Sequence, residues 1–239
     1  MSANPHAKKK ISVILPTYNE RENIVPLISA LLKVLKNEEP QIIVVDDNSP
    51  DGTAKAVEKK FASHKHVKLC VRKRDRGLAS AIMKGISLAK GDYLIFMDTD
   101  FNHDPKDITK MLKNLPGNDV VIGSRFVKGG GMEGAKLRWY CSYAMNQFIK
   151  ISLRLPTKEN LSGYILISKS ALFRCPLEKI FKGYGDYNIS LFKCLADQGA
   201  HIKEVPVYYK ERTYGESKTR FVKHLIEYLR TVWRVRKGV

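Results

Sequence analysis

The sequence predicts an α/β protein, with a mostly parallel central sheet, flanking helices and a Rossmann-like arrangement. Short apolar runs, each long enough for one buried strand, alternate with segments in which apolar residues recur every three or four positions. Strands that alternate with helices in this way are typical of βαβ units. The chain has 239 residues and shows no Pro/Ser-rich linker, so we expect one domain.

The first half of the chain carries the more regular pattern. We expect strands at 11–15, 41–45, 67–71, 93–97 and 120–122, and helices at 23–36, 53–62 and 78–89. Residues 1–10 predict a disordered basic tail, and residues 11–125 predict the nucleotide-binding half.

The regular alternation stops near Gly123, and residues 126–239 form the second half. Residues 128–135 are rich in glycine and predict a loop rather than a dinucleotide site, because they neither end a good strand nor open a helix. Beyond it we expect helices at 137–155, 187–198 and 219–237 and strands at 164–167 and 202–207. The last helix is basic and amphipathic, so its apolar face suits either the core or a membrane surface.

The amino-acid composition indicates what kind of partner the protein binds and in which compartment it lies. Lys and Arg number 42 and Asp and Glu 24, so the formal charge is +18, which indicates an anionic partner. The four cysteines are scattered, which excludes a zinc ribbon and favours free thiols in a reducing compartment. No apolar run approaches the ~20 residues of a membrane span, and no signal peptide is visible. We therefore expect a soluble, cytoplasm-facing protein whose membrane attachment, if any, is peripheral.

Acidic and polar residues follow three of the predicted strands, at residues 16–20, 46–49 and 98–102. In open α/β sheets the ligand binds outside the carboxyl ends of the strands. Asp and Asn are also common turn and cap residues, which would explain any one cluster alone. Three clusters at one sheet edge, in a basic protein, favour a ligand site.

The cluster after the fourth strand predicts a metal site. Asp98 and Asp100 can both face one cation if the backbone turns between them, and Asn102 can add a carbonyl oxygen. Mg²⁺ is usually held by one or two carboxylates together with substrate phosphate oxygens, and Mn²⁺ accepts the same ligands.

Five motifs, in order, give the chain a resemblance to the family 2 glycosyltransferases, which have the GT-A fold. They are PTYNE, DDNSPDGT, the DTD of residues 98–100 followed by Asn-His-Asp-Pro, the GSR of 123–125 and the RTYGESK of 212–218. The resemblance extends from about residue 11 to residue 221. It implies that 11–239 is a single GT-A domain, with a nucleotide-sugar half at 11–125 and an acceptor-side half at 126–239.

The resemblance also implies a role for individual residues. The nucleotide base region would be formed by Pro16, Tyr18, Glu20, Val44 and Asp46. The metal on the diphosphate would be held by Asp98, Asp100 and Asn102, with Thr99 also at the substrate. Phosphate groups of donor or acceptor would meet Arg125, Arg212 and Lys218. The family often has Ala at position 99 and Ser or Gln at position 102, so Asn102 is a departure.

The resemblance is closest to the members that transfer mannose from GDP-mannose to a polyprenyl phosphate such as dolichyl phosphate, with inversion. Transfer of glucose from UDP-glucose to the same acceptor is the alternative. A lipid phosphate has a second pKa of about 6 and is mostly a dianion at pH 7, so we assign no catalytic base. His103 is the tempting candidate, but a structural histidine is the better interpretation.

The same resemblance implies a peripheral enzyme on the cytoplasmic face of a membrane, that of the endoplasmic reticulum in a eukaryote, possessing small membrane subunits as anchors. Two other classes remain as hypotheses. A nucleic-acid-binding protein would account for the charge, but the acidic strand ends and the lack of a recognisable binding motif argue against nucleic acid as a partner. An inactive interaction subunit is disfavoured by the intact Asp98 and Asp100 pair.

Overall fold

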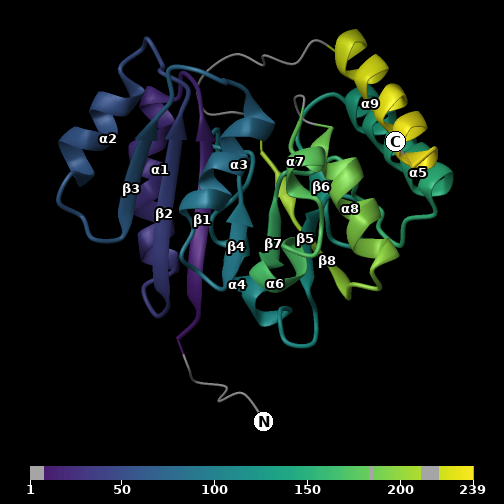
Figure 1. Ribbon diagram of the computed structural model, residues 1–239, viewed down its shortest axis with the longest axis horizontal. Coiled ribbons are helices and arrows are strands. Elements are labelled where there is room, and N and C mark those ends of the chain that lie inside the picture. The colour runs from purple at the N-terminus through teal and green to yellow at the C-terminus, as the bar shows by residue number, and fades with distance from the viewer. Residues whose placement is uncertain (1–7, 183–185, 211–220, 239) are drawn as a thin grey trace.

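The computed structural model describes residues 8–182, 186–210 and 221–238 and shows a seven-stranded sheet between two layers of helices (Figure 1). The strand order is β3-β2-β1-β4-β7-β5-β8. The strands are β1 (Lys10–Thr17), β2 (Glu39–Asp46), β3 (Val67–Val71), β4 (Tyr93–Phe96), β5 (Val120–Ser124), β7 (Ile165–Ser168) and β8 (Ile202–Pro206). Only β7 runs antiparallel to its neighbours in this sheet. The α/β class and the mostly parallel sheet are therefore confirmed.

The two faces of the sheet are covered by different helices. One buried cluster joins the sheet to α1 (Arg21–Val34), α2 (Thr53–Phe61) and α4 (Asp107–Lys113). The other joins it to α3 (Leu78–Leu88), α5 (Lys136–Leu153), α8 (Tyr187–Asp197) and α9 (Phe221–Arg236), with the short helices α6 (Lys169–Leu172) and α7 (Leu177–Ile180). Because both faces are buried, the central strands read as continuous apolar runs rather than as alternating patterns.

The order of the strands creates a switch point between β1 and β4. From β1 the chain builds outward to β2 and β3, and then returns through α3 to place β4 on the other side of β1. Loops that leave β1 and β4 therefore diverge at their carboxyl ends, which is where open α/β sheets bind their ligands. The predicted clusters after β1, β2 and β4 lie at this one edge.

Several details of the secondary structure differ from the expected ones. β1 begins at Lys10, and the backbone N–H of Lys9 donates to Glu38, so the expected tail of 1–10 ends too late. The expected loop at 128–135 contains β6 (Gly131–Met132), which pairs with β9 (Tyr208–Tyr209) in a second sheet. Helix α4 was not expected, because its seven residues bury only Ile108 and Met111 and give no clear periodicity.

The expectation of four free thiols is wrong for two of them. Cys175 and Cys194 form a disulfide, whereas Cys70 and Cys141 are free. The two bonded residues are 19 positions apart in the sequence, and only the packing of α7 against α8 brings them together. Their spacing alone carried no signal of this pairing.

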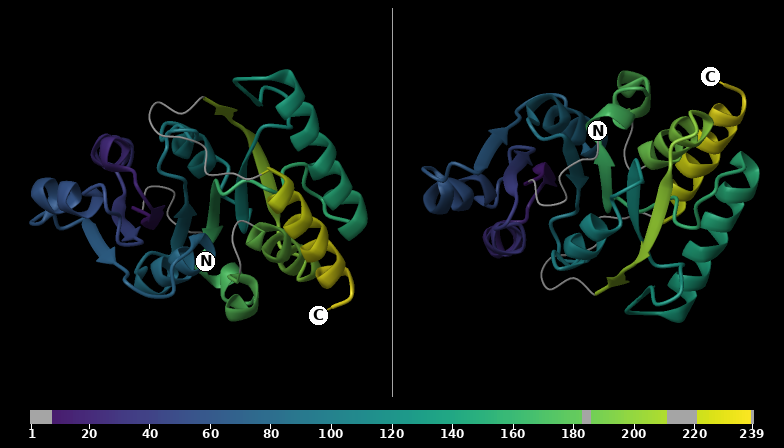
Figure 2. Two further views of the ribbon diagram at one scale, coloured as in Figure 1. Left: turned by 90° about the horizontal axis from the view of Figure 1, so that it is seen from above. Right: turned by 90° about the horizontal axis from the view of Figure 1, so that it is seen from below.

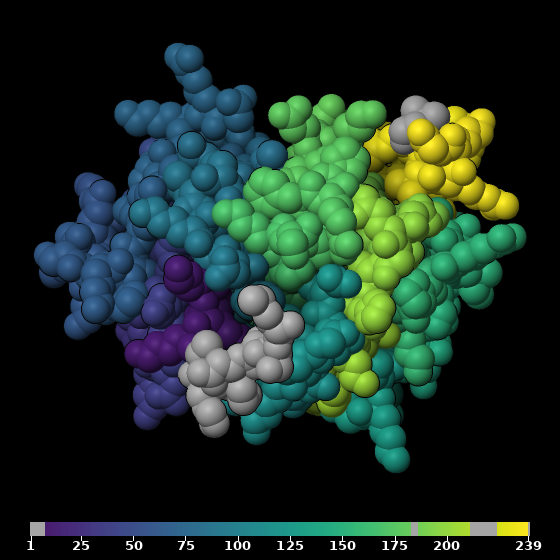
Figure 3. Space-filling view, turned by 60° about the horizontal axis from the view of Figure 1, so that its bottom comes forward, coloured from purple at the N-terminus to yellow at the C-terminus, as the bar shows by residue number. Residues whose placement is uncertain are grey.

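Helices α5 and α9 lie side by side at one end of the molecule, as both views of Figure 2 show. In Figure 3 they form the end opposite α2. Both helices expose large apolar side chains: Leu137, Tyr140, Phe148 and Ile151 on α5 and Ile226, Leu229 and Trp233 on α9. We call these seven residues the α5–α9 surface. No helix in the described part of the chain is long and apolar enough to cross a membrane.

A glycine just before β4 tests how closely the amino ends of β1 and β4 pack together. A Cβ added at Gly91 would lie 2.6 Å from the backbone nitrogen of Ser12 and 2.8 Å from the carbonyl oxygen of Lys10. Because backbone atoms cannot rotate away, we expect Gly91→Ala to lower the free energy of unfolding by about 3 kcal/mol in a urea titration. Gly117→Ala is the control, since its Cβ meets nothing within 4 Å and its positive φ costs only about 1 kcal/mol. Equal losses in the two variants would contradict the packing argument.

Candidate active site

The carboxylates predicted as metal ligands lie directly after β4. Asp98 keeps 45% of its side chain exposed, whereas Asp100 is 4% exposed. The backbone bends from Thr99 onward, between the two carboxylates, as the metal hypothesis requires, and Phe101 just beyond them has a φ of 60°. This turn brings the backbone N–H of Asn102 to one Asp100 oxygen at 3.1 Å and its side-chain Nδ2 to the other at 2.8 Å.

These residues fit a divalent cation that shares its ligands with a substrate. Among the residues that the structure describes, no group of three or more His, Cys, Asp and Glu side chains could hold a metal by itself. Mg²⁺ needs no such group, because one or two carboxylates and phosphate oxygens suffice. Asn102 directs its amide nitrogen at Asp100, so its service as a ligand through the carbonyl oxygen stays a prediction.

The loops after β1 and β2 are fastened to each other by a chain of short hydrogen bonds. The buried carboxylate of Asp46 accepts from the backbone N–H of Ser49 at 2.9 Å and from its hydroxyl at 2.5 Å. The same hydroxyl oxygen accepts from the backbone N–H of Asn19 at 2.9 Å. Asp46 thus fixes the loop beside the expected base region.

The other residues of that expected region lie at different depths. Tyr18 is exposed, Pro16 is half-buried, and Val44 is fully buried in the cluster beneath α1 and α2. The backbone N–H of Glu20 donates to the Thr53 hydroxyl at 3.0 Å, which ties the first loop to the start of α2. Their contact with a nucleotide stays a prediction.

Sequence reasoning placed Asp47 in the polar cluster at residues 46–49 but gave it no role. Asp47 pairs with Arg72 and accepts the backbone N–H of Gly77 at 2.7 Å. Both side chains of the ion pair are about nine-tenths buried. The pair fastens the loop after β3 to the loop after β2. An arginine directly after a strand end was the available signal.

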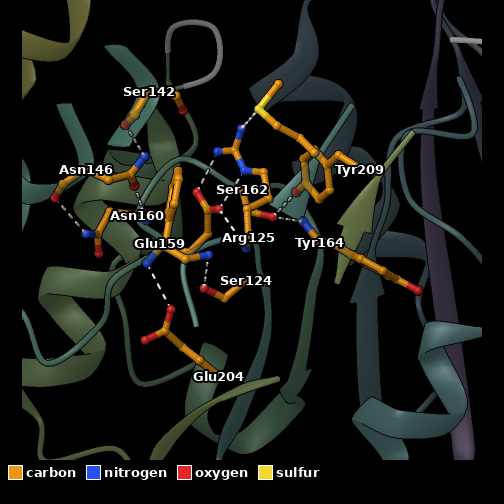
Figure 4. A network of polar contacts seen from close by, with 12 residues as sticks. Ser124, Arg125, Ser142, Asn146, Glu159, Asn160, Ser162, Tyr164, Glu204 and Tyr209 are labelled. Carbon is orange, nitrogen blue, oxygen red and sulfur yellow. Dashed lines mark hydrogen bonds and ion pairs between the residues drawn. The ribbon is translucent and has the colours of Figure 1, made fainter. Parts of the chain in front are cut away.

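Arg125, expected at a phosphate, follows β5 and pairs with Glu159 (Figure 4). Its Nε and Nη2 each lie 2.8 Å from a different Glu159 oxygen. Burial alone would lower the pKa of Arg125, but the Glu159 carboxylate outweighs it and raises that pKa. The guanidinium is therefore permanently charged. Glu159 was missed because nothing near it in the sequence marks a partner 34 positions away.

His103 connects the aspartates to β9. Its Nδ1 accepts the backbone N–H of Asp98 at 3.1 Å, and its Nε2 lies 2.9 Å from the Tyr209 hydroxyl. Its ring stacks on Tyr164 with centroids 4.7 Å apart. Burial lowers the pKa of His103 to about 4, so the ring is neutral at pH 7. These contacts agree with the structural interpretation of His103.

Arg212 and Lys218 lie outside the described residues. The residues just before that segment are attached to the loop that carries the aspartates: Lys210 Nζ lies 3.2 Å from Asp104, and Tyr209 contacts His103. Tyr209 and Lys210, the last described residues before that segment, therefore lie close to the loop that carries the predicted metal ligands. Thr99, between those ligands, is buried.

The neutral His103 predicts a specific loss of stability in acid. The pKa of His103 is about 4 in the folded chain and 6.5 for an unperturbed imidazole, so the stability that its neutral ring contributes is complete above pH 6.5 and is lost as the pH falls toward 4. Between pH 7 and pH 5 we expect wild type to lose about 2 kcal/mol more than His103→Gln, measured by urea unfolding in EDTA. Parallel pH dependences in the two proteins would contradict a buried neutral ring.

Comparison with known proteins places this chain in a family. Residues 12–181 match the family described as Glycosyl transferase family 2. Over 234 residues the chain is 34% identical to the dolichol-phosphate mannosyltransferase of Pyrococcus furiosus, with 95% of this chain and 64% of that relative covered. This chain thus spans less than two thirds of that relative's length.

Two further relatives match over most of their own length. The dolichol-phosphate mannosyltransferase of Saccharomyces cerevisiae is 31% identical, with 91% of this chain and 84% of that relative covered. The undecaprenyl-phosphate mannosyltransferase of Micrococcus luteus is 34% identical, with 87% of each covered.

Solved structures share the fold at lower identity. The glucosyl-3-phosphoglycerate synthase of Mycobacterium tuberculosis, in complex with Mn²⁺, UDP and its product, has a TM-score of 0.71 at 20% identity, covering 97% of this chain and 81% of that one. The same enzyme with Mg²⁺ and UDP also has a TM-score of 0.71, at 19% identity. The family match, the curated relatives and the shared fold together lead to one conclusion: this chain belongs to glycosyltransferase family 2 and has the GT-A fold.

Proposed function

We propose that the protein transfers mannose from GDP-mannose to a polyprenyl phosphate such as dolichyl phosphate, with inversion, and releases GDP. The observation that carries this proposal is the Asp98 and Asp100 turn at the switch point, in a chain whose relatives are named for mannose transfer to dolichol phosphate or undecaprenyl phosphate. Those relatives give no support to the UDP-glucose alternative.

The proposed transfer of mannose to a lipid phosphate requires charge neutralisation more than proton transfer. Mg²⁺ or Mn²⁺ held by Asp98 and Asp100 would stabilise the charge that develops on the departing diphosphate. The acceptor phosphate is already a dianion at pH 7 and needs no base, only orientation and positive charge. Arg125 supplies such a charge on the acceptor side, and we propose the same role for Arg212 and Lys218.

The α5–α9 surface supports a peripheral position on a membrane that holds the acceptor. Its apolar side chains are accompanied by exposed basic residues, namely Lys136, Arg138, Arg154, Arg230, Arg236 and Lys237. The Val232 and Thr231 side chains of α9 are buried, and Thr231 donates to Asp186 at 2.6 Å, so α9 both packs on the core and presents an apolar edge. Aromatic, aliphatic and basic side chains together suit the headgroup region. We propose the cytoplasmic face, of the endoplasmic reticulum in a eukaryote, with small membrane subunits as further anchors.

A labelled-donor assay tests the reaction. Membranes containing polyprenyl phosphate are incubated with the protein and radiolabelled GDP-mannose, UDP-glucose or UDP-galactose, and the labelled lipid is identified. We expect mannolipid from GDP-mannose alone, and a fall of at least a hundredfold in its rate of formation in Asp100→Asn, because the substitution removes the charge that faces the cation.

The matched control is Asp92→Asn, at the opposite end of β4, where the side chain is exposed. It should keep the wild-type rate. A glucolipid from UDP-glucose would contradict the proposed donor, and a fully active Asp100→Asn variant would remove this carboxylate from the mechanism.

Vesicle flotation tests the membrane surface. Ile151 is 75% exposed and Trp233 is 62% exposed, so we expect Ile151→Ser and Trp233→Ser each to lower the partition coefficient onto anionic vesicles by about tenfold. Binding should also weaken as salt rises, because the exposed charges are screened. Phe173→Ser is the control, since Phe173 is exposed at the end of α6, outside this surface. An equal loss in the control would contradict a specific membrane face.

A further inference from the structure

Glu159 is a completely buried carboxylate that the proposed reaction does not use directly. It lies in the segment between α5 and β7, and both of its oxygens are engaged by the Arg125 guanidinium at 2.8 Å (Figure 4). One of them also lies 3.3 Å from the Arg125 backbone nitrogen, which donates to it. A bidentate pair fixes the plane of a guanidinium as well as its position.

Residues of other elements hold the segment that carries Glu159 through hydrogen bonds. The backbone N–H groups of Lys158 and Glu159 donate to the Glu204 carboxylate on β8, at 2.8 and 2.9 Å. Three residues further on, the Ser162 hydroxyl lies 2.5 Å from the Tyr209 hydroxyl. Glu159 is therefore held at both ends of a short segment and cannot follow Arg125 if that side chain moves.

Two aromatic rings hold the faces of the same guanidinium. The Arg125 carbon Cζ lies 4.9 Å from the centre of the Phe126 ring and 4.7 Å from that of Tyr209. Nη1 is the one guanidinium nitrogen for which no bond to Glu159 is seen in the described structure, and it lies 4.0 Å from the sulfur of Met132 on β6. A thioether sulfur is a weak hydrogen-bond acceptor. A phosphate oxygen in its place would form a stronger hydrogen bond with Nη1.

The stability of the fold alone does not account for the buried ion pair of Arg125 and Glu159. Burying two charges costs several kcal/mol of desolvation, and apolar residues of similar volume often stabilise a fold as well or better. What the pair provides is a permanently charged arginine with a single orientation. That property matters for binding an anion in one geometry.

The place of Arg125 in the fold indicates which phosphate it meets. β5 is separated from β4 by β7, so Arg125 starts from the second half of the sheet, and its guanidinium packs on Tyr209, whose hydroxyl contacts His103 beside the predicted metal ligands. Phe126, which follows it, contacts Trp139 and Tyr143 of α5, with ring centroids 5.8 and 5.5 Å apart. Through Phe126, Arg125 is thus next to α5, the helix that carries four of the seven residues of the α5–α9 surface. A lipid acceptor bound at that surface would arrive on this side of Arg125.

We propose that Glu159 is a positioning residue, which holds Arg125 in the orientation that receives the monophosphate of an isoprenoid lipid. This inference rests on the proposed function. Glu159 acts only through Arg125, so removing its charge should matter only while the arginine is present.

A double-mutant cycle tests this coupling with farnesyl phosphate, a short isoprenyl monophosphate, as the probe and GDP as the donor-side ligand. Dissociation constants are measured for wild type, Glu159→Gln, Arg125→Met and the double variant, each checked for folding by circular dichroism. We expect Glu159→Gln to weaken farnesyl phosphate binding at least tenfold in wild type and less than twofold in the Arg125→Met background. GDP binding should change less than twofold throughout.

Two further variants separate positioning from folding. Glu159→Asp keeps the carboxylate but shortens the side chain by one methylene, so we expect affinity for farnesyl phosphate to fall by about threefold. This variant replaces Glu159→Gln in the cycle if Glu159→Gln does not fold. Glu204→Gln removes a charge beside the same segment but keeps an amide oxygen that can accept from its N–H groups, and it should keep probe affinity within twofold.

Several results would overturn the inference: no binding of the probe by wild type, independent effects in the cycle, equal weakening in Glu204→Gln, or a parallel loss of GDP binding that would assign Arg125 to the donor. Failure of the proposed function has a different signature, because the labelled mannolipid would then be missing even though the probe binds and the cycle shows coupling.

Discussion

The parallel pairing of β1 with both β2 and β4 is the constraint on which the rest of this structure depends. Because the three strands run in the same direction, their carboxyl ends meet at one edge. The loops that follow them therefore bring Asp46, Asp98 and Asp100 to one side of the sheet, although as many as 54 positions separate them in the chain. We propose that a cation and a phosphate complete the site, which would allow a basic protein to keep carboxylates together at that edge.

The loops at this edge are held by hydrogen bonds that backbone N–H groups donate to side chains. Asp46 and Asp47 each hold a loop through the N–H groups of Ser49 and Gly77, and His103 holds the N–H of Asp98. Such bonds satisfy backbone groups that leave the sheet without a ladder partner. They also place rigid attachment points around the proposed ligand site, where burial keeps the His103 ring neutral.

Positive charge is distributed in two distinct ways across the fold. Most of the excess lies on exposed lysines and arginines, where it attracts anions at long range and is screened by salt. Arg72 and Arg125 are instead buried and paired with Asp47 and Glu159. The buried charges are fixed in direction, whereas the exposed ones, including those near the α5–α9 surface, can adapt to a membrane.

The sequence by itself determined the α/β class, nearly every long helix and strand within two residues, and the polar cluster that follows β4, because hydrophobic period and strand-end polarity are local properties. Only the tertiary structure decided the antiparallel insertion of β7, the small sheet of β6 and β9, the disulfide of Cys175 with Cys194, and the partners of Arg125 and His103. Each of these joins segments that are distant in the chain. Their geometry depends on how whole layers pack, and no local pattern of residues encodes it.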